Sequence, residues 1–324
     1  MADPSGPGSS LRPLGLGEVL DRAVNLCVKY FVPLTVIFVV YAIPLAVVQF
    51  FATQDFNHVL QSLVDAMRSG RQGDQSTALA RELDSMSGVN AWAPLLILMS
   101  YFVYPLPAAA LIATAAGFYL GKPVTFGEAY QAALSRWLNL IGVNVMYSFA
   151  AGFLYLAFVF LIVLLAFGIG FLYSVLPAVG IAIGVILGVL FLVLTIGFVI
   201  VATLAFEMSY FGCVLEKQNL AVAFVRGISR VFVGIGLRRS LLVGCAFAAI
   251  ILGIGIVTAV GEAVIIGFFK DPVLGTVYTT VVRIATSAFT TAFITIFYFD
   301  LRVREEGLDL QLAAQASGSL PSTP

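Results

Sequence analysis

The sequence predicts an all-α integral membrane protein, built as a bundle of six transmembrane helices. Of its 324 residues, 60% are apolar and only 10% are charged, whereas ordinary globular proteins have about 45–50% and about 25%. Stretches of about 20 mainly apolar residues, each enough to cross about 30 Å of hydrocarbon, recur along the chain. Basic residues are concentrated in alternate connecting segments. These observations exclude a soluble enzyme, a disordered chain and a nucleic-acid-binding protein.

The chain is expected to consist of two tails and one membrane domain. Residues 1–13 are rich in Pro, Gly and Ser and lack the apolar run of a signal peptide, which predicts a disordered tail before an uncleaved first span. The membrane domain covers residues 14–306, and residues 307–324 form a cytoplasmic C-terminal tail. The six predicted spans are residues 31–52, 92–119, 141–170, 181–206, 241–267 and 276–299.

The third and fourth spans come from one apolar run, residues 141–206, which at about 1.5 Å per residue is long enough to cross two or even three times. Pro177 and Gly180 interrupt this run, so we place the break there. Charge placement then decides the count. With six spans and both ends inside, the cytoplasmic segments hold 12 basic residues and the outer loops hold 4. A seventh crossing would put the basic residues between 217 and 239 outside, so six is preferred.

The largest outer loop, residues 53–90, is predicted to contain two short amphipathic helices. Their apolar faces consist of Phe56, Leu60, Leu63 and Met67 in the first and Leu79, Leu83 and Met86 in the second. The same loop holds His58, the only histidine, which excludes metal sites that need two imidazoles. The three cysteines lie in or beside apolar segments and are interpreted as small buried hydrophobes rather than a disulfide framework.

Three short amphipathic segments precede the first, third and fifth spans. They are LGLGEVLDRAV (14–24), VTFGEAYQAAL (124–134) and QNLAVAFVRGI (218–228). Aligned without gaps, they share large apolar residues at i, i+4 and i+8 and a small residue at Ala23, Ala133 and Gly227. One interpretation is an interfacial helix followed by a two-span hairpin, used three times. The alternative is the general tendency of membrane proteins to place amphipathic helices before spans.

The two ends of the chain carry a resemblance to a known family. The segments LRPLGLGEVLDRAVNLCVKYFVPL and YFDLRVREEGLDLQL resemble bacterial six-helix integral membrane proteins named for their likeness to the membrane domain of glycerophosphoryl diester phosphodiesterase, a largely uncharacterised family. The resemblance implies a multi-pass protein of the bacterial cytoplasmic (inner) membrane. We expect the catalytic barrel found beside some members to be absent, because no soluble stretch is long enough to hold one. The family name therefore implies no phosphodiesterase activity here.

The end of the sixth span has a charge pattern of its own. Asp300 and Arg304 stand at i, i+4 in the favourable acid-first order, and Arg302 stands at the same spacing from Glu306. This predicts that the helix continues for about two turns beyond the membrane, as far as Gly307. A docking site for a partner and an ordinary charged helix end at the headgroups remain alternatives.

Two ionisable residues lie inside the last two spans. Glu262 in the fifth span and Arg283 in the sixth could meet across that hairpin, and Thr286, Ser287 and Thr290 continue a polar stripe beside Arg283. Such a stripe would face the bundle. Two interpretations stay open: a structural pair or independent snorkelling of the two side chains, with the stripe making interhelical hydrogen bonds, or a polar cavity that handles a ligand. Pro44, Pro105 and Pro107 should kink the first hairpin.

A third set of candidates lies on the predicted cytoplasmic face. It comprises Lys217, Arg226, Arg230, Arg238 and Arg239, together with Asp300, Arg302 and Arg304 at the end of the last span. Basic residues beside a span attract anionic lipid headgroups, and the set is equally suited to a protein partner. Positive-inside topology alone is the other explanation for the basic members.

No catalytic or metal-binding motif is recognisable, so the sequence predicts no catalytic residues, no metal site and no cofactor. The leading hypothesis is a non-enzymatic membrane protein acting in envelope organisation or lipid homeostasis, by binding membrane lipids or a partner at the cytoplasmic face. A transporter or channel for a small solute or lipid, using the polar stripe of the sixth span, is the alternative. An intramembrane enzyme is the third possibility.

Overall fold

The computed structural model describes residues 12–68, 92–233 and 235–307, and for residues 53–68, 175, 235 and 306 it describes the backbone alone. This part of the chain is almost entirely helical and has no strand, which confirms the all-α class. Six helices within it are long and apolar enough to cross a membrane, in agreement with the predicted number. They are Phe31–Ala52, Trp92–Tyr119, Trp137–Ser174, Pro177–Leu215, Gly236–Phe269 and Pro272–Glu305.

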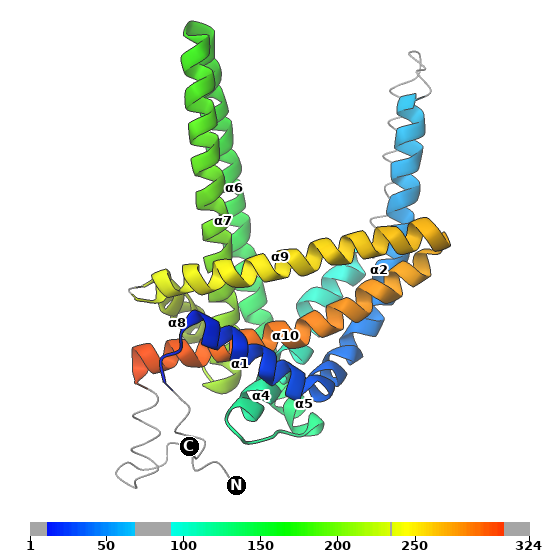
Figure 1. Ribbon diagram of the computed structural model, residues 1–324, viewed down its shortest axis with the longest axis vertical. Helices are drawn as coiled ribbons and strands as arrows, with labels where there is room; N and C mark the ends of the chain where they lie inside the picture. Colours follow the sequence, from blue (N-terminus) through cyan, green and yellow to red (C-terminus); the bar gives the residue numbers. More distant parts are fainter. Residues whose placement is uncertain (1–11, 69–91, 234, 308–324) are drawn as a thin grey trace. The chain divides into compact units, whose positions relative to one another are not determined.

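The chain divides into two compact units (Figure 1). Unit 1 consists of Met1–Leu16, Arg136–Leu252 and Phe297–Pro324. Unit 2 consists of Gly17–Ser135 and Gly253–Ile296. The helices are α1 (Leu16–Lys29), α2 (Phe31–Arg68), a short helix over residues 92–98, η1 (Met99–Val103), α4 (Pro105–Tyr119), α5 (Phe126–Ser135), α6 (Trp137–Val175), α7 (Pro177–Leu215), α8 (Leu220–Phe232), α9 (Ile235–Phe269) and α10 (Pro272–Glu306).

In unit 2, helix α2 continues beyond the first candidate span, which has the predicted bounds. Residues 53–68, assigned to an outer loop from the sequence, continue α2 without a break. The apolar faces predicted for that loop and His58 lie outside the described side chains, and residues 69–91 lie outside the described chain. The helix also passes through Pro44 without ending.

The second candidate span contains a turn of π-helix, η1, directly before Pro105. The amide of Tyr104 donates to the carbonyl of Met99, five residues earlier, at 2.8 Å. Proline cannot donate a backbone hydrogen bond and its ring collides with the preceding turn, so the helix widens there by one residue. The kink predicted from Pro105 therefore takes the form of a π-turn.

Small residues and aromatic contacts hold the rest of unit 2 together. A Cβ atom on Gly117 of α4 would lie 2.6 Å from the carbonyl oxygen of Lys122, so only glycine allows the chain to fold back and lay α5 on α4. The Tyr130 hydroxyl of α5 donates to the carbonyl of Ile37 in α2 at 2.8 Å. A capping box starts α5, since the Thr125 amide donates to Glu128 at 2.8 Å.

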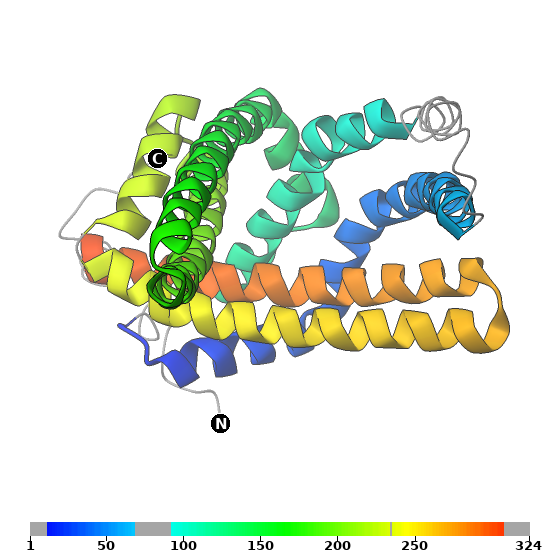
Figure 2. The same cartoon turned by 90° about the horizontal axis from the view of Figure 1, so that it is seen from above.

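In unit 1, α6 and α7 form a hairpin whose helices lie side by side in both ribbon views (Figures 1 and 2). The break falls at Leu176, and α7 starts at Pro177 as predicted. Each helix has 39 residues and is about 58 Å long. A Cβ atom on Gly180 would lie 2.7 Å from the backbone of Tyr173, which explains why the tight turn requires glycine there.

The start of α6 and the end of α7 pack with α8, the start of α9 and the end of α10. We call this packed region the base. In the base, α8 packs directly on α7. A Cβ atom on Gly227 would overlap the Ser209 hydroxyl and lie 2.8 Å from the carbonyl oxygen of Ala205, so only glycine allows this approach. The buried hydroxyl of Tyr210 donates to the side-chain oxygen of Asn144 at 2.6 Å. Asn219 precedes α8 and makes no side-chain capping hydrogen bond.

The three predicted amphipathic segments are helices α1, α5 and α8, and they share one pattern of burial. Two aligned positions are buried in all three helices, and both hold small or branched residues. The first is Val19, Ala129 and Ala223, and the second, one turn later, is Ala23, Ala133 and Gly227. Large apolar residues on the other face are exposed, including Val24 (47%), Phe126 (49%) and Leu134 (59%). Each helix therefore packs through small side chains and turns larger apolar ones outward.

Candidate functional site

The last turns of α10, which belong to unit 1, carry two pairs of polar residues on different faces. Tyr298 and Arg302 form one i, i+4 pair and Asp300 and Arg304 form the other. Residues two positions apart on an α-helix point about 200° from each other, so the two pairs contact different elements of the base. Two ionic networks result.

The first network, the Asp300 clasp, consists of Leu14, Arg239, Asp300 and Arg304. The Asp300 carboxylate is fully buried and accepts the backbone amide of Leu14 at 2.7 Å. It also accepts Nε of Arg239 at 3.1 Å and Nε of Arg304 at 3.0 Å. Both guanidiniums donate through Nη2 to the Leu14 carbonyl, each at 2.7 Å. The predicted Asp300–Arg304 pair is thus confirmed, and it is one side of a closed four-residue network.

The second network, the Glu216 network, forms where α7 turns into α8. Nη1 of Arg230, a side chain that is 5% exposed, lies 2.6 Å from Oε1 of Glu216, and its Nη2 donates to Oε2 at 3.0 Å. The hydroxyl of Tyr298 and the side-chain amide of Gln218 also donate to this carboxylate. Further out, Arg302 lies 3.8 Å from Oε1 of Glu216. It therefore turns towards α7, and the side chain of Glu306, its predicted partner, lies outside the described residues.

The surroundings of Glu216 favour its ionised form. Burial alone would raise the pKa of this carboxyl, but hydrogen bonds from Arg230 and Tyr298 and the positive charges of Arg230 and Arg302 lower the pKa below its ordinary value. Outside the networks, the capping hydrogen bonds from Thr125 lower the pKa of Glu128 at the start of α5. Burial raises the pKa of the Cys27 thiol in α1, which fits its interpretation as a small hydrophobe.

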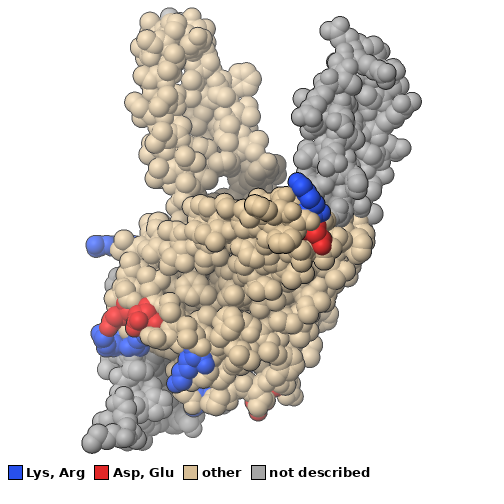
Figure 3. Space-filling view, turned by 45° about the vertical axis from the view of Figure 1, so that its right-hand side comes forward, with Lys and Arg blue, Asp and Glu red and all other residues tan. Residues whose placement is uncertain are grey.

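The predicted basic candidates fall into two groups. Arg230, Arg239, Arg302 and Arg304 are engaged in the networks. Lys217 and Arg238 are exposed, and Arg226 is 58% exposed with its guanidinium 3.8 Å from Glu216. In Figure 3 the charged side chains gather in small groups, while the projecting α6–α7 hairpin shows none. The exposed group, which we call the basic rim, consists of Lys217, Arg226 and Arg238.

In unit 2, Arg283 and Glu262 do not meet. Nη1 of Arg283 donates to the side-chain oxygen of Gln49 in α2 at 2.5 Å. Glu262 instead lies beside the start of α10, because a Cβ atom on Gly275 would be 3.5 Å from its Cγ. Gly275 precedes Arg283 by eight residues, or about 12 Å along the helix.

The hydroxyl groups of the predicted polar stripe are directed into their own helix. Thr286 donates to the carbonyl of Val282 at 2.8 Å, and Ser287 donates to that of Ile284 at 2.7 Å. Thr290, one turn further along α10, is half-buried. Hydrogen bonds of this kind satisfy the hydroxyls within their own helix. The stripe therefore offers few free hydroxyl groups for hydrogen bonds to another helix or for a polar cavity.

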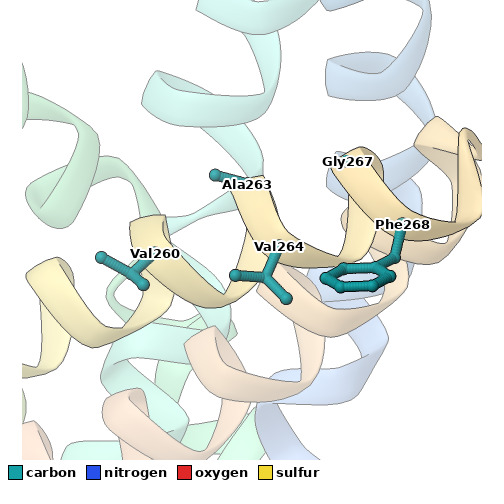
Figure 4. Close-up of a pocket in the computed structure, with 5 residues that line it drawn as sticks. All are labelled: Val260, Ala263, Val264, Gly267 and Phe268. Atoms are coloured by element: carbon teal, nitrogen blue, oxygen red, sulfur yellow. The ribbon is translucent and has the colours of Figure 1, made fainter.

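One shallow depression of about 470 Å³ lies on α9 within unit 2 (Figure 4). It is lined by Val260, Ala263, Val264, Gly267 and Phe268. These residues follow one face of the helix at spacings of three and four, and none offers a polar side chain. The depression therefore fits an apolar contact such as a hydrocarbon chain. Among the described residues, no group of three His, Cys, Asp or Glu side chains is placed to hold a metal ion.

Sequence reasoning missed two participants. Gln49 is an isolated amide in the first span, between Val48 and Phe50, and a search for polar side chains at the depth of Arg283 would have found it. Leu14 takes part through its backbone, which no residue pattern indicates.

The chain matches no protein-family model, no curated protein and no solved structure.

Proposed function

We propose that the protein is a non-enzymatic multi-pass protein of a bacterial cytoplasmic membrane that binds anionic lipid headgroups at its cytoplasmic face, and that it acts in envelope organisation or lipid homeostasis. The observation that carries the proposal is the outward face of α8. Val222 (43% exposed), Val225 (62%) and Arg226 point away from the base, while Ala223 and Gly227 are buried. A helix lying at the headgroups needs this combination of apolar and basic residues on its free side.

The burial pattern of α1 and α5 supports the same role in unit 2, since each buries small residues and exposes large apolar ones. A threefold use of one interfacial helix and one two-span hairpin is part of the proposal. Both chain termini lie in the cytoplasm in this arrangement, because the basic rim then faces the side on which basic residues are retained. Reporter domains fused after Gly121, after Arg239 and at the C-terminus should all report cytoplasm, and one outward result would contradict this orientation.

Membership of the phosphodiesterase membrane-domain family also belongs to the proposal. The two chain ends that carry the resemblance meet in the Asp300 clasp, where Leu14 from the first segment binds Asp300 and Arg304 from the second. A contact between these segments gives a physical reason for both to have specific sequences. The exposed basic rim would serve a protein partner at the same face if lipid binding is absent.

Headgroup binding is tested with the purified protein in nanodiscs of phosphatidylcholine containing increasing phosphatidylglycerol, with lipid retention measured by native mass spectrometry. Each basic residue near an anionic surface contributes about 1 kcal/mol, so Lys217→Gln and Arg226→Gln should each weaken retention of phosphatidylglycerol about fivefold. Lys270→Gln, at the turn between α9 and α10, is the matched control and should change nothing. Equal retention of both lipids by the wild type would refute the proposal.

A lipid or small-solute carrier is the second candidate, favoured by one observation: Arg283 and Gln49 form a polar contact between two candidate spans. The test is transbilayer movement of a fluorescent phospholipid in proteoliposomes. A carrier that uses this contact should lose its activity on Arg283→Gln with protein abundance unchanged.

A further inference from the structure

Arg283 holds a positive charge in the middle of an apolar helix without an acidic partner. It stands 12 residues after Asp271, which precedes α10, and 17 residues before Asp300, the nearest charged residues along the chain. Its one hydrogen bond within the described part of the chain goes to the neutral side chain of Gln49. Glu262, the acidic residue of the adjoining helix, lies about two turns away, level with Gly275. A guanidinium in hydrocarbon requires a counter-charge or water, and no residue that the structure describes supplies a carboxylate here.

The neighbourhood offers hydrogen-bond donors in place of a carboxylate. The oxygen of the Gln49 amide faces Arg283, so its nitrogen remains available to donate to a third group. Tyr41 lies two turns earlier on the same face of α2, within electrostatic range of Arg283. An Arg–Gln pair of this kind presents several N–H groups and is suited to an anion with two oxygens.

The pair can be reached from the surface of the helices. Arg283 on α10 and Gln49 on α2 are both partly exposed. In the bilayer proposed above, residues exposed at this depth contact lipid chains and not water. A ligand that reaches Arg283 must therefore be soluble in hydrocarbon and carry an anionic group.

We propose that Arg283 and Gln49 bind the carboxylate of a long-chain amphiphile, such as a fatty acid, whose hydrocarbon chain lies in the surrounding bilayer. The planar guanidinium matches the two oxygens of a carboxylate. This site is in unit 2 and is independent of the basic rim of unit 1.

The probe is oleate, bound to the purified full-length chain in a neutral maltoside detergent and measured by equilibrium binding and by the shift in melting temperature. Arg283→Gln should weaken oleate binding about tenfold or more, because a charge-assisted bidentate contact is lost. Methyl oleate, which keeps the chain but lacks the anion, should bind no better to the wild type than to Arg283→Gln. Lys270→Gln is the control for general charge attraction and should bind oleate within about twofold of wild type.

Gln49→Glu keeps the proposal falsifiable if Arg283→Gln folds poorly. It supplies an internal carboxylate beside the guanidinium, so oleate binding should fall while the ligand-free melting temperature stays equal or rises. Acetate or inorganic phosphate added to the buffer tests whether the site binds soluble anions instead of an amphiphile. Neither should displace oleate. Oleate binding that is absent, unaffected by Arg283→Gln and Gln49→Glu, or matched by methyl oleate would overturn the proposal. Displacement by millimolar acetate would overturn the amphiphile in favour of a soluble carboxylate.

Discussion

Apolar side chains are buried very differently in the two parts of unit 1. Along the α6–α7 hairpin, Gly180 is the one buried residue among those described from 149 to 200. In the base, by contrast, Leu140, Leu204 and Phe211 are at most 2% exposed. Hydropathy is therefore a poor guide to packing in this molecule, because a lipid-facing side chain and a protein-facing one can be the same leucine.

The hairpin and the base are also stabilised by different interactions. In the membrane proposed above, the projecting hairpin depends on its own backbone hydrogen bonds and on lipid, since its side chains contact few others. The base combines close packing with two ionic networks built around one buried aspartate and one part-buried glutamate. Substitutions should therefore be costly in the base and mild in the hairpin.

The largest effect is expected at the Asp300 clasp. Asp300→Asn leaves two guanidiniums without their carboxylate, and breaking a buried pair costs about 3–5 kcal/mol. We expect a large fall in melting temperature and in cellular abundance, measured by fluorescence-detected size-exclusion chromatography. Asp271→Asn is the matched control, because Asp271 only accepts the Val273 amide at the start of α10 and asparagine can do the same. Similar losses in both variants would show that Asp300 has no special role.

The next largest difference is expected when a leucine is truncated to alanine in each part. Leu204→Ala in the base removes a side chain that is 2% exposed and should cost about 2–5 kcal/mol. Leu190→Ala in the hairpin, where the residue is 52% exposed, should cost much less in detergent micelles. Thermal unfolding followed by intrinsic fluorescence checks the difference. A larger loss from Leu190→Ala would mean that the hairpin is packed against protein.

Adding one methyl group gives a smaller effect of opposite sign in the two parts. Gly227→Ala collides with Ser209 and should push α8 away from α7 at a cost of about 1–3 kcal/mol. Gly188→Ala meets nothing within 4 Å and should be neutral or slightly stabilising, because alanine favours helix. Melting temperatures of the two variants in one detergent test this. Equal shifts would argue against close packing of α8.

The smallest effect is a pH dependence confined to the base. The pKa of Glu216 is lower in the folded protein than in the unfolded chain, so its contribution is present above the unfolded value, about 4.3, and is lost as the pH falls through the folded value. Melting temperature should therefore decline on the acidic side of that value. In Glu216→Gln this part of the decline should disappear. An unchanged acid limb in that variant would contradict the assignment.

Local chemistry explains which structural features the sequence could predict. Pro177 ends the third candidate span because it has no amide hydrogen, and Asp300 pairs with Arg304 because they are one turn apart. The six apolar helices followed from length and composition alone. Each of these depends on residues within a few positions of one another.

Features that depend on distant contacts could not be predicted. The partner of Arg283 was expected in the neighbouring helix, but Gln49 comes from α2, 234 residues earlier. The role of Arg302 at Glu216 depends on how α7 and α10 pack, and the spacing to Glu306 suggested a different partner. Pro105 predicted a distortion of the second span. The sequence could not indicate that the distortion is the π-helical turn η1.

The Asp300 clasp has a consequence for the order of events during synthesis. Leu14 emerges early from the ribosome, but the carboxylate that accepts its amide is made 286 residues later. At about 5–20 residues per second, that interval is roughly 15–60 s. During this time the backbone of Leu14 must remain hydrated or be held by a chaperone. Closure of the clasp therefore marks completion of the last helix, and a chain interrupted before Asp300 would leave Leu14 and Arg239 open to quality-control proteases.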